Sequence, residues 1–241
     1  MQKLRWKTLN LFNHFKAMMK TFMKKISLLF VCFFVFPLFA YSATDCTDND
    51  CAEEGVIFKD PFRKELRDGW AWVREVPKDW RITDEALEIK MEPMRQDGVR
   101  NILFRKLPKK EEGPFVVTVE VKAVQPYTNQ YQQAGLYWMQ DDKLRFKFVL
   151  ELIDGKLCVF PGNKLLETAH VVLRWRVDGT RIVAEYQPGA TGEFLKAFEA
   201  NLPEERNDET DRIALQCWHG PADTESWTRF QKFTISEPEK E

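Results

Sequence analysis

The amino-acid sequence predicts an all-β protein, an antiparallel β-sandwich of the jelly-roll type. From Gly55 onward, short runs rich in β-branched and aromatic residues alternate with turn signals, and almost no stretch keeps a helical period. About a dozen strands at this spacing are typical of a sandwich. The chain has no internal repeat, which argues against a propeller.

The predicted strands follow one another closely along the chain. In the first half they are residues 56–60, 69–75, 80–83, 86–91, 101–107 and 115–123. In the second half they are residues 155–160, 169–177, 181–187, 193–200, 212–220 and 227–236. Asp-Gly pairs at 154–155 and 178–179 predict tight hairpin turns, because both residue types tolerate a left-handed backbone.

One predicted hairpin, residues 132–156, has the most regular pattern. Its two strands flank an acidic turn at residues 140–142. In the second strand the even positions are Leu144, Phe146, Phe148, Leu150 and Leu152. The odd positions between them are Arg145, Lys147, Val149 and Glu151. Strict alternation predicts one face that packs in the core and one polar face.

Residues 1–43 are predicted to be a leader rather than part of the fold. Two lysines precede an apolar run that Pro37 interrupts and small residues end, which is the pattern of a secretory signal peptide. The run is shorter than the roughly 20 residues that span a membrane, so no stable membrane span is expected after cleavage. Met23 is the expected true start, and the alternative is a long n-region that anchors the protein uncleaved. We therefore expect a secreted or periplasmic protein, with a polar linker at 44–55 and one sandwich domain at 56–237.

The charge of the chain argues against nucleic acid as a partner. Residues 1–43 hold seven of the 36 Lys and Arg and none of the 37 Asp and Glu. The rest of the chain therefore has 29 basic and 37 acidic residues, a formal charge of −8. Such an acidic surface repels polyphosphate.

Four cysteines follow the predicted leader. Cys46 and Cys51 could form a disulfide in an oxidising compartment, whereas Cys158 and Cys217 lie in apolar runs and are expected to be buried thiols. No spacing of Cys and His fits a metal site, so neither a metal nor another cofactor is expected. A structural calcium ion stays an alternative: it needs several loop carboxylates, of which residues 141–142 supply two and residues 47–54 another group, without a defined loop pattern. The sequence specifies no oligomeric state.

Five motifs, in a fixed order along the chain, suggest a relationship. They are FKDPF at 58–62, GWAWVREVPKDWRITDEALEI at 69–89, QQAGLYWMQDDKLRFKFVLE at 132–151, VVLRWRVDGTRIVAEY at 171–186 and WTRFQKFTI at 227–235. This order resembles that of the concanavalin A-like lectin/glucanase superfamily, above all its uncharacterised secreted members and the C-terminal sandwich of family 43 β-xylosidases. The likeness covers about residues 56–236.

The resemblance implies a fold more than an activity. Members of this superfamily serve as lectins, carbohydrate-binding modules and glycoside hydrolases, so the activity has to be argued from the site. Laminarinase-type members carry a strand with the spacing Glu-x-Asp-x-x-Glu. In this chain Glu151-Leu-Ile-Asp154 is the nearest string, and it has no second glutamate.

Polar side chains of several predicted strands could form one patch if these strands line one sheet. Its members would be Trp138, Lys147, Glu151, Arg174, Arg176, Glu185, Gln216 and Trp218. Aromatic rings cover the apolar face of a sugar, while charged and amide groups bond its hydroxyls. We therefore predict a non-catalytic domain that binds a carbohydrate on one sheet face and adjacent rim loops. The loop candidates are Tyr127, Tyr131 and Trp227.

Two alternatives stay open. A glycoside hydrolase or lyase could use Glu151 and Glu185, and His219 in an acidic loop could serve acid–base chemistry. Nearby arginines would lower the pKa of both glutamates, which is unfavourable for a general acid, so no residue is predicted to be catalytic. The other alternative is a structural or protein-interaction domain whose outward charges only form cross-strand pairs.

Overall fold

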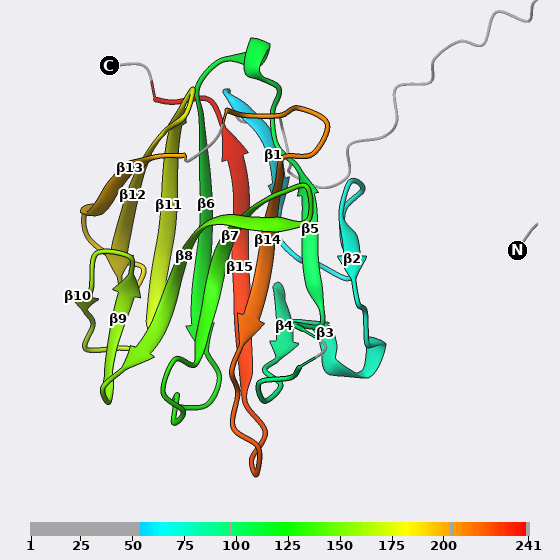
Figure 1. The fold of residues 1–241 in the computed structure, drawn as a ribbon, viewed down its shortest axis with the longest axis vertical. Coiled ribbons are helices and arrows are strands. Elements are labelled where there is room, and N and C mark those ends of the chain that lie inside the picture. The colour runs from blue at the N-terminus through cyan, green and yellow to red at the C-terminus, as the bar shows by residue number, and fades with distance from the viewer. Residues whose placement is uncertain (1–53, 97, 203–204, 240–241) are drawn as a thin grey trace, which may run out of the picture. The chain divides into compact units, whose positions relative to one another are not determined.

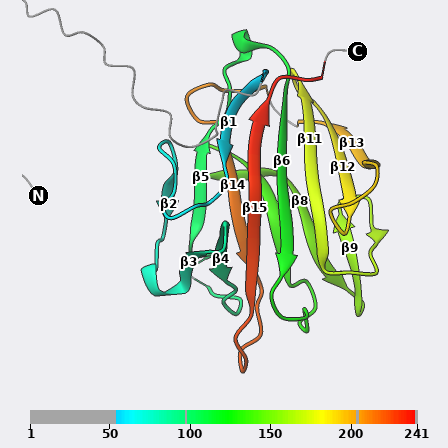
Figure 2. The ribbon, with the colours of Figure 1, turned by 180° about the vertical axis from the view of Figure 1, so that it is seen from behind.

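The computed structural model describes residues 54–239 apart from residue 97 and residues 203–204. In this part of the chain the strands form two antiparallel sheets that are stacked as two layers (Figure 1; Figure 2). The only helical elements among the described residues are the short 3-10 turns η1 (Pro77–Asp79) and η2 (Lys110–Glu112). The predicted β-sandwich is therefore confirmed.

One layer is an eight-stranded sheet with the strand order β13-β12-β11-β6-β15-β4-β3, in which β1 also pairs with β15. Its strands are β1 (Val56–Asp60), β3 (Trp80–Thr83), β4 (Ala86–Lys90), β6 (Phe115–Ala123), β11 (His170–Asp178), β12 (Arg181–Pro188), β13 (Leu195–Asn201) and β15 (Trp227–Ser236). This layer lies nearer the viewer in Figure 2, where β15 is seen unobstructed.

The other layer is a seven-stranded sheet with the strand order β10-β9-β8-β7-β14-β5-β2. Its strands are β2 (Ala71–Val73), β5 (Ile102–Lys106), β7 (Gln133–Gln140), β8 (Lys143–Ile153), β9 (Lys156–Phe160), β10 (Lys164–Leu165) and β14 (Arg212–Trp218). The strand β14 comes late in the chain and lies between β7 and β5, so it joins two distant parts of the sequence.

Turn chemistry places the hairpins where the sequence predicts them. Asp154 and Gly155, between β8 and β9, both have a positive φ, at 49° and 71°. Asp141 and Asp142, between β7 and β8, have φ values of 51° and 59°. Two successive left-handed residues give the twist that two-residue hairpins need.

The core between the layers contains a cluster of large aromatic side chains. Trp138 of the seven-stranded sheet and Trp175 of the eight-stranded sheet lie with ring centroids 6.2 Å apart, and both are almost completely buried. Phe146 packs against Trp175 at 5.4 Å. The buried indole N–H of Trp138 needs a hydrogen-bond acceptor, and it donates to Asp211 Oδ1 at 3.2 Å.

The regular alternation in β8 holds only beyond its first residues. Phe148 and Leu150 are fully buried in the core, as predicted, but Leu144 is 50% exposed. A β-bulge between Trp138 and Met139 shifts the register so that Leu144, not Arg145, pairs with Met139. A one-residue shift reverses which face a side chain takes, so the prediction that Leu144 belongs to the core face is wrong.

The FKDPF motif has a structural role. Asp60 is completely buried, and its carboxylate accepts hydrogen bonds from the backbone N–H of Phe62 at 2.7 Å and of Arg67 at 3.0 Å. It also accepts from the indole N–H of Trp70 at 2.8 Å. The carboxylate thereby connects the end of β1 to the segment before β2.

Candidate functional site on the seven-stranded sheet

Strand register decides which side chains leave the seven-stranded sheet on the side away from the core, called here its outer face. Glu151 of β8 pairs with Gln133 of β7, which pairs with Trp218 of β14. Further along, Lys147 of β8 pairs with Tyr137 of β7. The residues that alternate with them pack in the core, so all five side chains belong to the outer face.

Five side chains of the outer face form one hydrogen-bonded group, called here the polar cluster: Gln133, Tyr137, Lys147, Glu151 and Gln216. The Gln133 Oε1 accepts from Lys147 Nζ at 2.7 Å and from the Tyr137 hydroxyl at 3.2 Å. The Gln133 Nε2 donates to Glu151 Oε1 at 3.0 Å. Lys147 Nζ lies 3.3 Å from Glu151 Oε2, and Gln216 hydrogen-bonds Tyr137. Gln133 is therefore the centre of the group.

The Tyr137 side chain lies along the sheet. Its hydroxyl contacts Gln133, four residues away, although an extended strand separates these residues by about 13 Å. Both side chains must therefore lean across Gly135, which presents no side chain. A Cβ at Gly135 would lie 2.4 Å from the Phe148 carbonyl oxygen and 2.8 Å from the Val149 Cα, so only glycine fits there.

Burial controls the protonation of this group. Burial raises the pKa of Glu151, and the Lys147 ammonium opposes that rise only in part. Burial also raises the pKa of the Tyr137 phenol well above its ordinary value. Burial, followed by the negative charge of Glu151, raises the pKa of the neighbouring Cys158 thiol to about 11. At neutral pH these groups offer hydrogen bonds rather than a thiolate or phenolate nucleophile.

Lys147 is the charged member of the polar cluster that reaches solvent. Its side chain is 22% exposed, whereas that of Glu151 is 4% exposed. The Lys147 ammonium also lies 4.6 Å from the centroid of the Phe160 ring. Glu151 and Gln133 thus hold the ammonium in one position between an aromatic ring and solvent, with the partly exposed Trp218 beside Gln133.

A hollow of about 510 Å³ adjoins the polar cluster on the same face, within the size range of small-molecule sites. Its lining residues are Val73, Arg74, Ile102, Phe104, Met139, Asp141, Asp142, Thr210 and Arg212. They come from β2, β5, β7 and β14, from the turns that follow β2 and β7, and from the turn that precedes β14. The hollow thus combines an apolar floor with charged walls.

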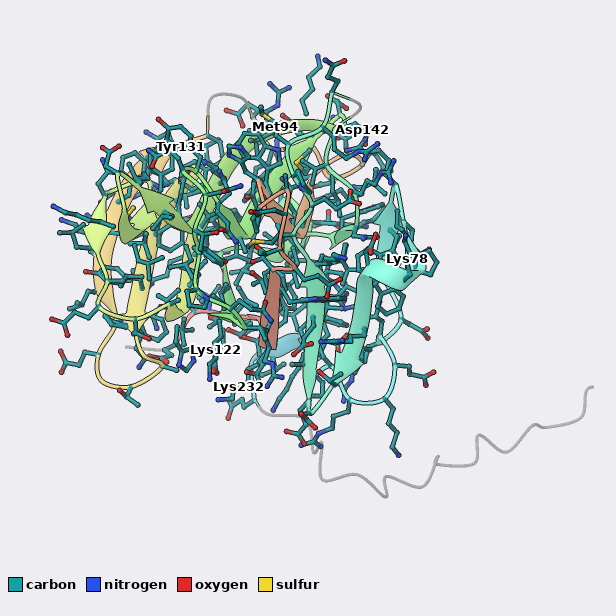
Figure 3. The ribbon with its side chains drawn as sticks, turned by 90° about the horizontal axis from the view of Figure 1, so that it is seen from below. Lys78, Met94, Lys122, Tyr131, Asp142 and Lys232 are labelled. Atoms are coloured by element: carbon teal, nitrogen blue, oxygen red, sulfur yellow. The ribbon has the colours of Figure 1, made fainter. Side chains whose placement is uncertain are left out.

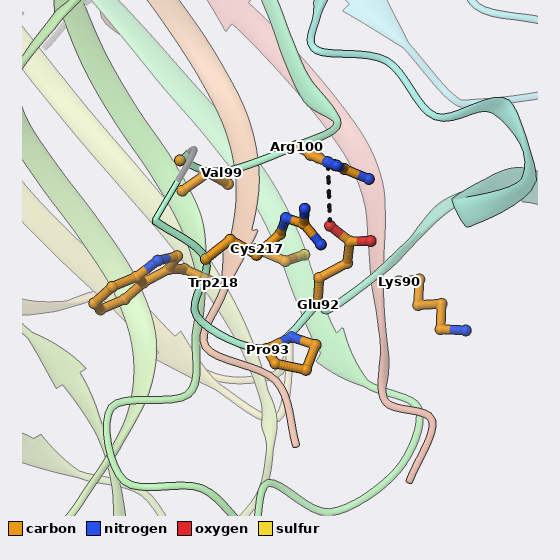
Figure 4. Close-up of a pocket in the computed structure, with 9 residues that line it drawn as sticks. Lys90, Glu92, Pro93, Val99, Arg100, Cys217 and Trp218 are labelled. Atoms are coloured by element: carbon orange, nitrogen blue, oxygen red, sulfur yellow. Dashed lines mark ion pairs between the residues drawn. The ribbon is translucent and has the colours of Figure 1, made fainter. Parts of the chain in front are cut away.

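A much smaller cavity lies at the opposite end of the outer face (Figure 4). Its volume is about 10 Å³, room for one water molecule at most, and it lies between Trp218, Val99 and Pro93. Beside it, Arg100 Nε lies 3.8 Å from Glu92 Oε2. This cavity is too small for an organic ligand.

The structure divides the predicted patch into three parts. Lys147, Glu151, Gln216 and Trp218 do share the outer face of the seven-stranded sheet. Trp138 is 1% exposed because it pairs with Phe146 on the core side, so its assignment to the polar face is wrong. The remaining three, Arg174, Arg176 and Glu185, lie on β11 and β12 of the other sheet, so they cannot join the patch.

The predicted alternative catalytic pair is also separated. Glu151 and Glu185 leave opposite sheets, each on the side away from the core, and Glu185 instead accepts a hydrogen bond from Arg174 at 2.7 Å. Two carboxylates that act on one glycosidic bond have to lie within about 10 Å of each other. A hydrolase or lyase that uses this pair is therefore excluded.

The loop candidates differ in their accessibility. Tyr127 and Trp227 are each 7% exposed, so the prediction that they contact a ligand is wrong. The Tyr127 hydroxyl lies 3.0 Å from Thr228 Oγ1, within hydrogen-bond distance. Tyr131 is 48% exposed and lies on the same side of the sandwich as Asp142, opposite the side with Lys122 and Lys232 (Figure 3). His219 lies with its ring centroid 5.1 Å from that of Trp218, at the edge of the outer face.

Other predictions concern thiols, metals and the N-terminal region. Cys158 and Cys217 are free and buried, as predicted. The leader, the start of the linker and the pair Cys46 and Cys51 lie outside the described residues. Within the described range, no three His, Cys, Asp or Glu side chains gather as a metal site would need. No helix of the described part is long and apolar enough to cross a membrane.

Sequence reasoning missed the central residues of the site. Gln133 and Tyr137 occupy the same alternate positions of β7 that Lys147 and Glu151 occupy in β8, so extending the projection to the neighbouring strand would have found them. The lining of the hollow has no comparable signal, because its residues come from four separate parts of the chain.

Solved structures with a similar fold include several family 43 glycoside hydrolases. One is described as Bacteroides ovatus Xyloglucan PUL GH43B, with 17% identity and a TM-score of 0.61 over 77% of this chain and 40% of that chain. Another is a xylan β-1,4-xylosidase from Bacillus halodurans, with 13% identity and a TM-score of 0.56 over 74% of this chain and 38% of that chain. The GH43 protein BlXynB from Bacillus licheniformis has 14% identity and a TM-score of 0.55, over 75% and 39% of the two chains.

These similarities confirm the predicted resemblance to the concanavalin-like sandwich region of family 43 xylosidases, and at such identities they show the fold alone. The match spans about two fifths of the length of each of these enzymes. No protein-family profile and no curated protein sequence matches the chain.

Proposed function

We propose that this protein binds a carbohydrate, without a catalytic step, on the outer face of the seven-stranded sheet. The observation that carries the proposal is the polar cluster. Its hydrogen bonds, with Glu151 and Tyr137 as partners, fix the Lys147 ammonium and the amides of Gln133 and Gln216 in position. Positioned planar groups and an ammonium beside aromatic rings suit the hydroxyls and the C–H face of a sugar.

Within this site the residues have different roles. Lys147 and Trp218 would contact the sugar, because both are partly exposed on the outer face. Gln216 is 8% exposed and would act through its hydrogen bond to Tyr137. Glu151 would act through Lys147, since its own side chain is buried. The polar cluster holds one carboxylate, and hydrolysis of a glycosidic bond needs two acting groups, so binding is favoured over catalysis.

The comparisons support the carbohydrate class of ligand. The similar structures are enzymes whose descriptions name xyloglucan or xylan, and in each case this chain matches part of the length. The leader predicted in residues 1–43 would place such binding outside the cytoplasm, where polymeric glycans are found.

The test is a glycan array probed with the purified protein, expressed as the full chain, followed by titration of the strongest ligands with tryptophan fluorescence. Lys147→Met and Trp218→Ala should each weaken binding by about tenfold or more. Arg176→Ala, an exposed change on the other sheet, should leave the affinity unchanged and serves as the control. Absence of saturable binding across plant, algal and bacterial glycans would overturn the proposal in favour of a structural or protein-interaction domain.

A further inference from the structure

The hollow and the polar cluster are parts of one continuous surface. Met139 of the hollow and Tyr137 of the polar cluster are successive outward positions of β7, about 7 Å apart along the strand. Arg212 of the hollow and Gln216 of the polar cluster are both on β14, about 13 Å apart. A single extended ligand can therefore contact both.

The floor of the hollow is apolar. Ile102 is 6% exposed and packs with Tyr137 and Ala214, and the partly buried Phe104 and Met139 complete the same group. This apolar group continues from the hollow to the polar cluster without a charged residue between Phe104, Ala214 and Tyr137, which pair in register across three strands. Such a surface fits the C–H face of a sugar ring.

Two guanidinium groups in the walls are held in place by backbone carbonyls. Arg212 donates to the carbonyls of Asp211 at 2.9 Å and Glu209 at 2.6 Å, and Arg74 donates from Nε to the Val99 carbonyl. Within the described residues, neither arginine forms an ion pair with a carboxylate. The bonds to carbonyls use the Nε–H of Arg74 and one N–H each of Nη1 and Nη2 of Arg212, so each guanidinium has further N–H groups to donate.

Three acceptor groups complete the walls. Asp141 and Asp142 line the hollow from the turn between β7 and β8, and no hydrogen bond to another described residue engages their carboxylates. Thr210 also lines it, and its hydroxyl oxygen is buried without a partner in the described part of the chain. A buried hydroxyl of this kind requires a ligand or a water molecule to satisfy it.

We propose that the hollow is a second subsite for the same ligand, and that it takes an uncharged sugar residue. This inference rests on the proposed function. The apolar face of the sugar would lie on Phe104 and Met139, and its hydroxyls would bond Asp141, Asp142 and Arg212. Two carboxylates balance two guanidinium charges, so a uronic acid would gain attraction from the arginines but lose as much by repulsion from the aspartates. The ligand is then a neutral oligosaccharide long enough to cover both subsites.

The experiment is isothermal titration calorimetry of the full chain with disaccharides and hexasaccharides of xylose and of β-linked glucose, and with oligogalacturonides of the same lengths. The neutral hexasaccharide should bind at least about tenfold more tightly than the disaccharide. Phe104→Ala should remove that gain. Asp142→Asn, in an exposed turn that tolerates asparagine, should reduce it about threefold without disturbing the fold. Leu165→Ala, an exposed apolar change on β10, is the matched control and should leave the gain intact.

The outcomes separate this inference from the proposal on which it rests. Equal affinity for both lengths, or a gain that survives Phe104→Ala and Asp142→Asn, would overturn the second subsite while the first still binds. A larger gain for oligogalacturonides than for the neutral sugars would overturn the choice of an uncharged sugar. No binding of any oligosaccharide would overturn both.

Discussion

The two outer faces of the sandwich use similar residue types in different ways. On the eight-stranded sheet, Glu88 accepts hydrogen bonds from Arg81 and Arg229, and Glu120 bonds both His170 and Lys232. Each carboxylate has one cation that is largely in solvent, Arg81 at 52% and Lys232 at 76% exposed, and one that is partly buried, Arg229 at 27% and His170 at 24%. Such pairs cover a sheet and contribute little to recognition.

On the seven-stranded sheet the charged pair is joined to neutral donors and acceptors. Lys147 and Glu151 share Gln133, which also bonds Tyr137, and the group lies beside a hollow. The comparison teaches that the charge content of a strand face does not identify a binding site. Both faces hold a buried glutamate, and the seven-stranded face differs in the neutral Gln133 and Tyr137 that join its charged pair and in the hollow beside them.

The largest expected effect is a difference in the free energy of unfolding between a tryptophan of the core and one of the outer face. Trp138→Ala should lower the free energy of unfolding by about 3–5 kcal/mol, because it opens a cavity among aromatic side chains. Trp218→Ala, at the partly exposed edge of the outer face, should cost less than about 1 kcal/mol. Urea denaturation of the two variants measures the difference. Equal losses would show that Trp218 is as much a core residue as Trp138, and would weaken its role in binding.

The next effect tests the close approach of β7 and β8 at Gly135, where a Cβ would also lie 2.9 Å from Leu173 Cδ1 in the core. Gly135→Ala places a Cβ against the backbone of β8, so we expect a loss of about 3 kcal/mol or more. Gly179→Ala is the matched control: its φ is also positive, at 56°, but a Cβ there meets nothing within 4 Å. That control should cost about 1 kcal/mol. Thermal unfolding decides the matter, and similar melting temperatures for both variants would contradict the close approach of β7 and β8.

A third change removes a charged acceptor from the outer face of the eight-stranded sheet. Glu88→Gln should destabilise the protein by about 1.5–3 kcal/mol, because Arg81 and Arg229 lose a charged acceptor at 2.7 Å and 2.6 Å. Burial raises the pKa of Glu88, but the hydrogen bonds from Arg229 and Arg81 outweigh burial and lower it below 4.5. The stabilisation is therefore present above the unfolded-state pKa and is lost as the pH falls through the folded-state pKa.

Urea denaturation at neutral pH and in acid measures this difference between wild type and variant. Glu85→Gln is the control, since its partner Arg63 and Glu85 itself are both more than half exposed, and it should change stability by less than about 1 kcal/mol. A difference between wild type and Glu88→Gln that persists unchanged in strong acid would show that ionised Glu88 is not its source.

The smallest effect concerns the pH dependence of the polar cluster. Because burial raises the pKa of Glu151 in the folded protein, the folded state keeps this proton to a higher pH than the unfolded state does. Its contribution to the free energy of unfolding therefore falls as the pH rises from 4.5 through the folded-state pKa. Glu151→Gln cannot titrate, so this part of the pH dependence should disappear. A variant with the same pH profile as wild type would place the titrating group elsewhere.

The strands follow from local sequence patterns. The run predicted at 169–177 is β11 at 170–178, and its alternation correctly places Leu173 and Trp175 in the core. The Asp-Gly turns and the acidic turn of the long hairpin also lie where they are predicted. These features depend on neighbours in sequence, so the composition of each segment is enough to predict them.

By itself the sequence determined most of the strands, the buried face of β11 and the pair Lys147 and Glu151 on one polar side. Only the tertiary structure decided that β11 and β12 belong to the other sheet, that Trp138 points into the core, and that β14 lies between β7 and β5. The physical reason is that alternation assigns a side chain to one of two faces but not to a sheet or a register. Those depend on pairings between strands distant in the chain, which the packing of the whole core selects.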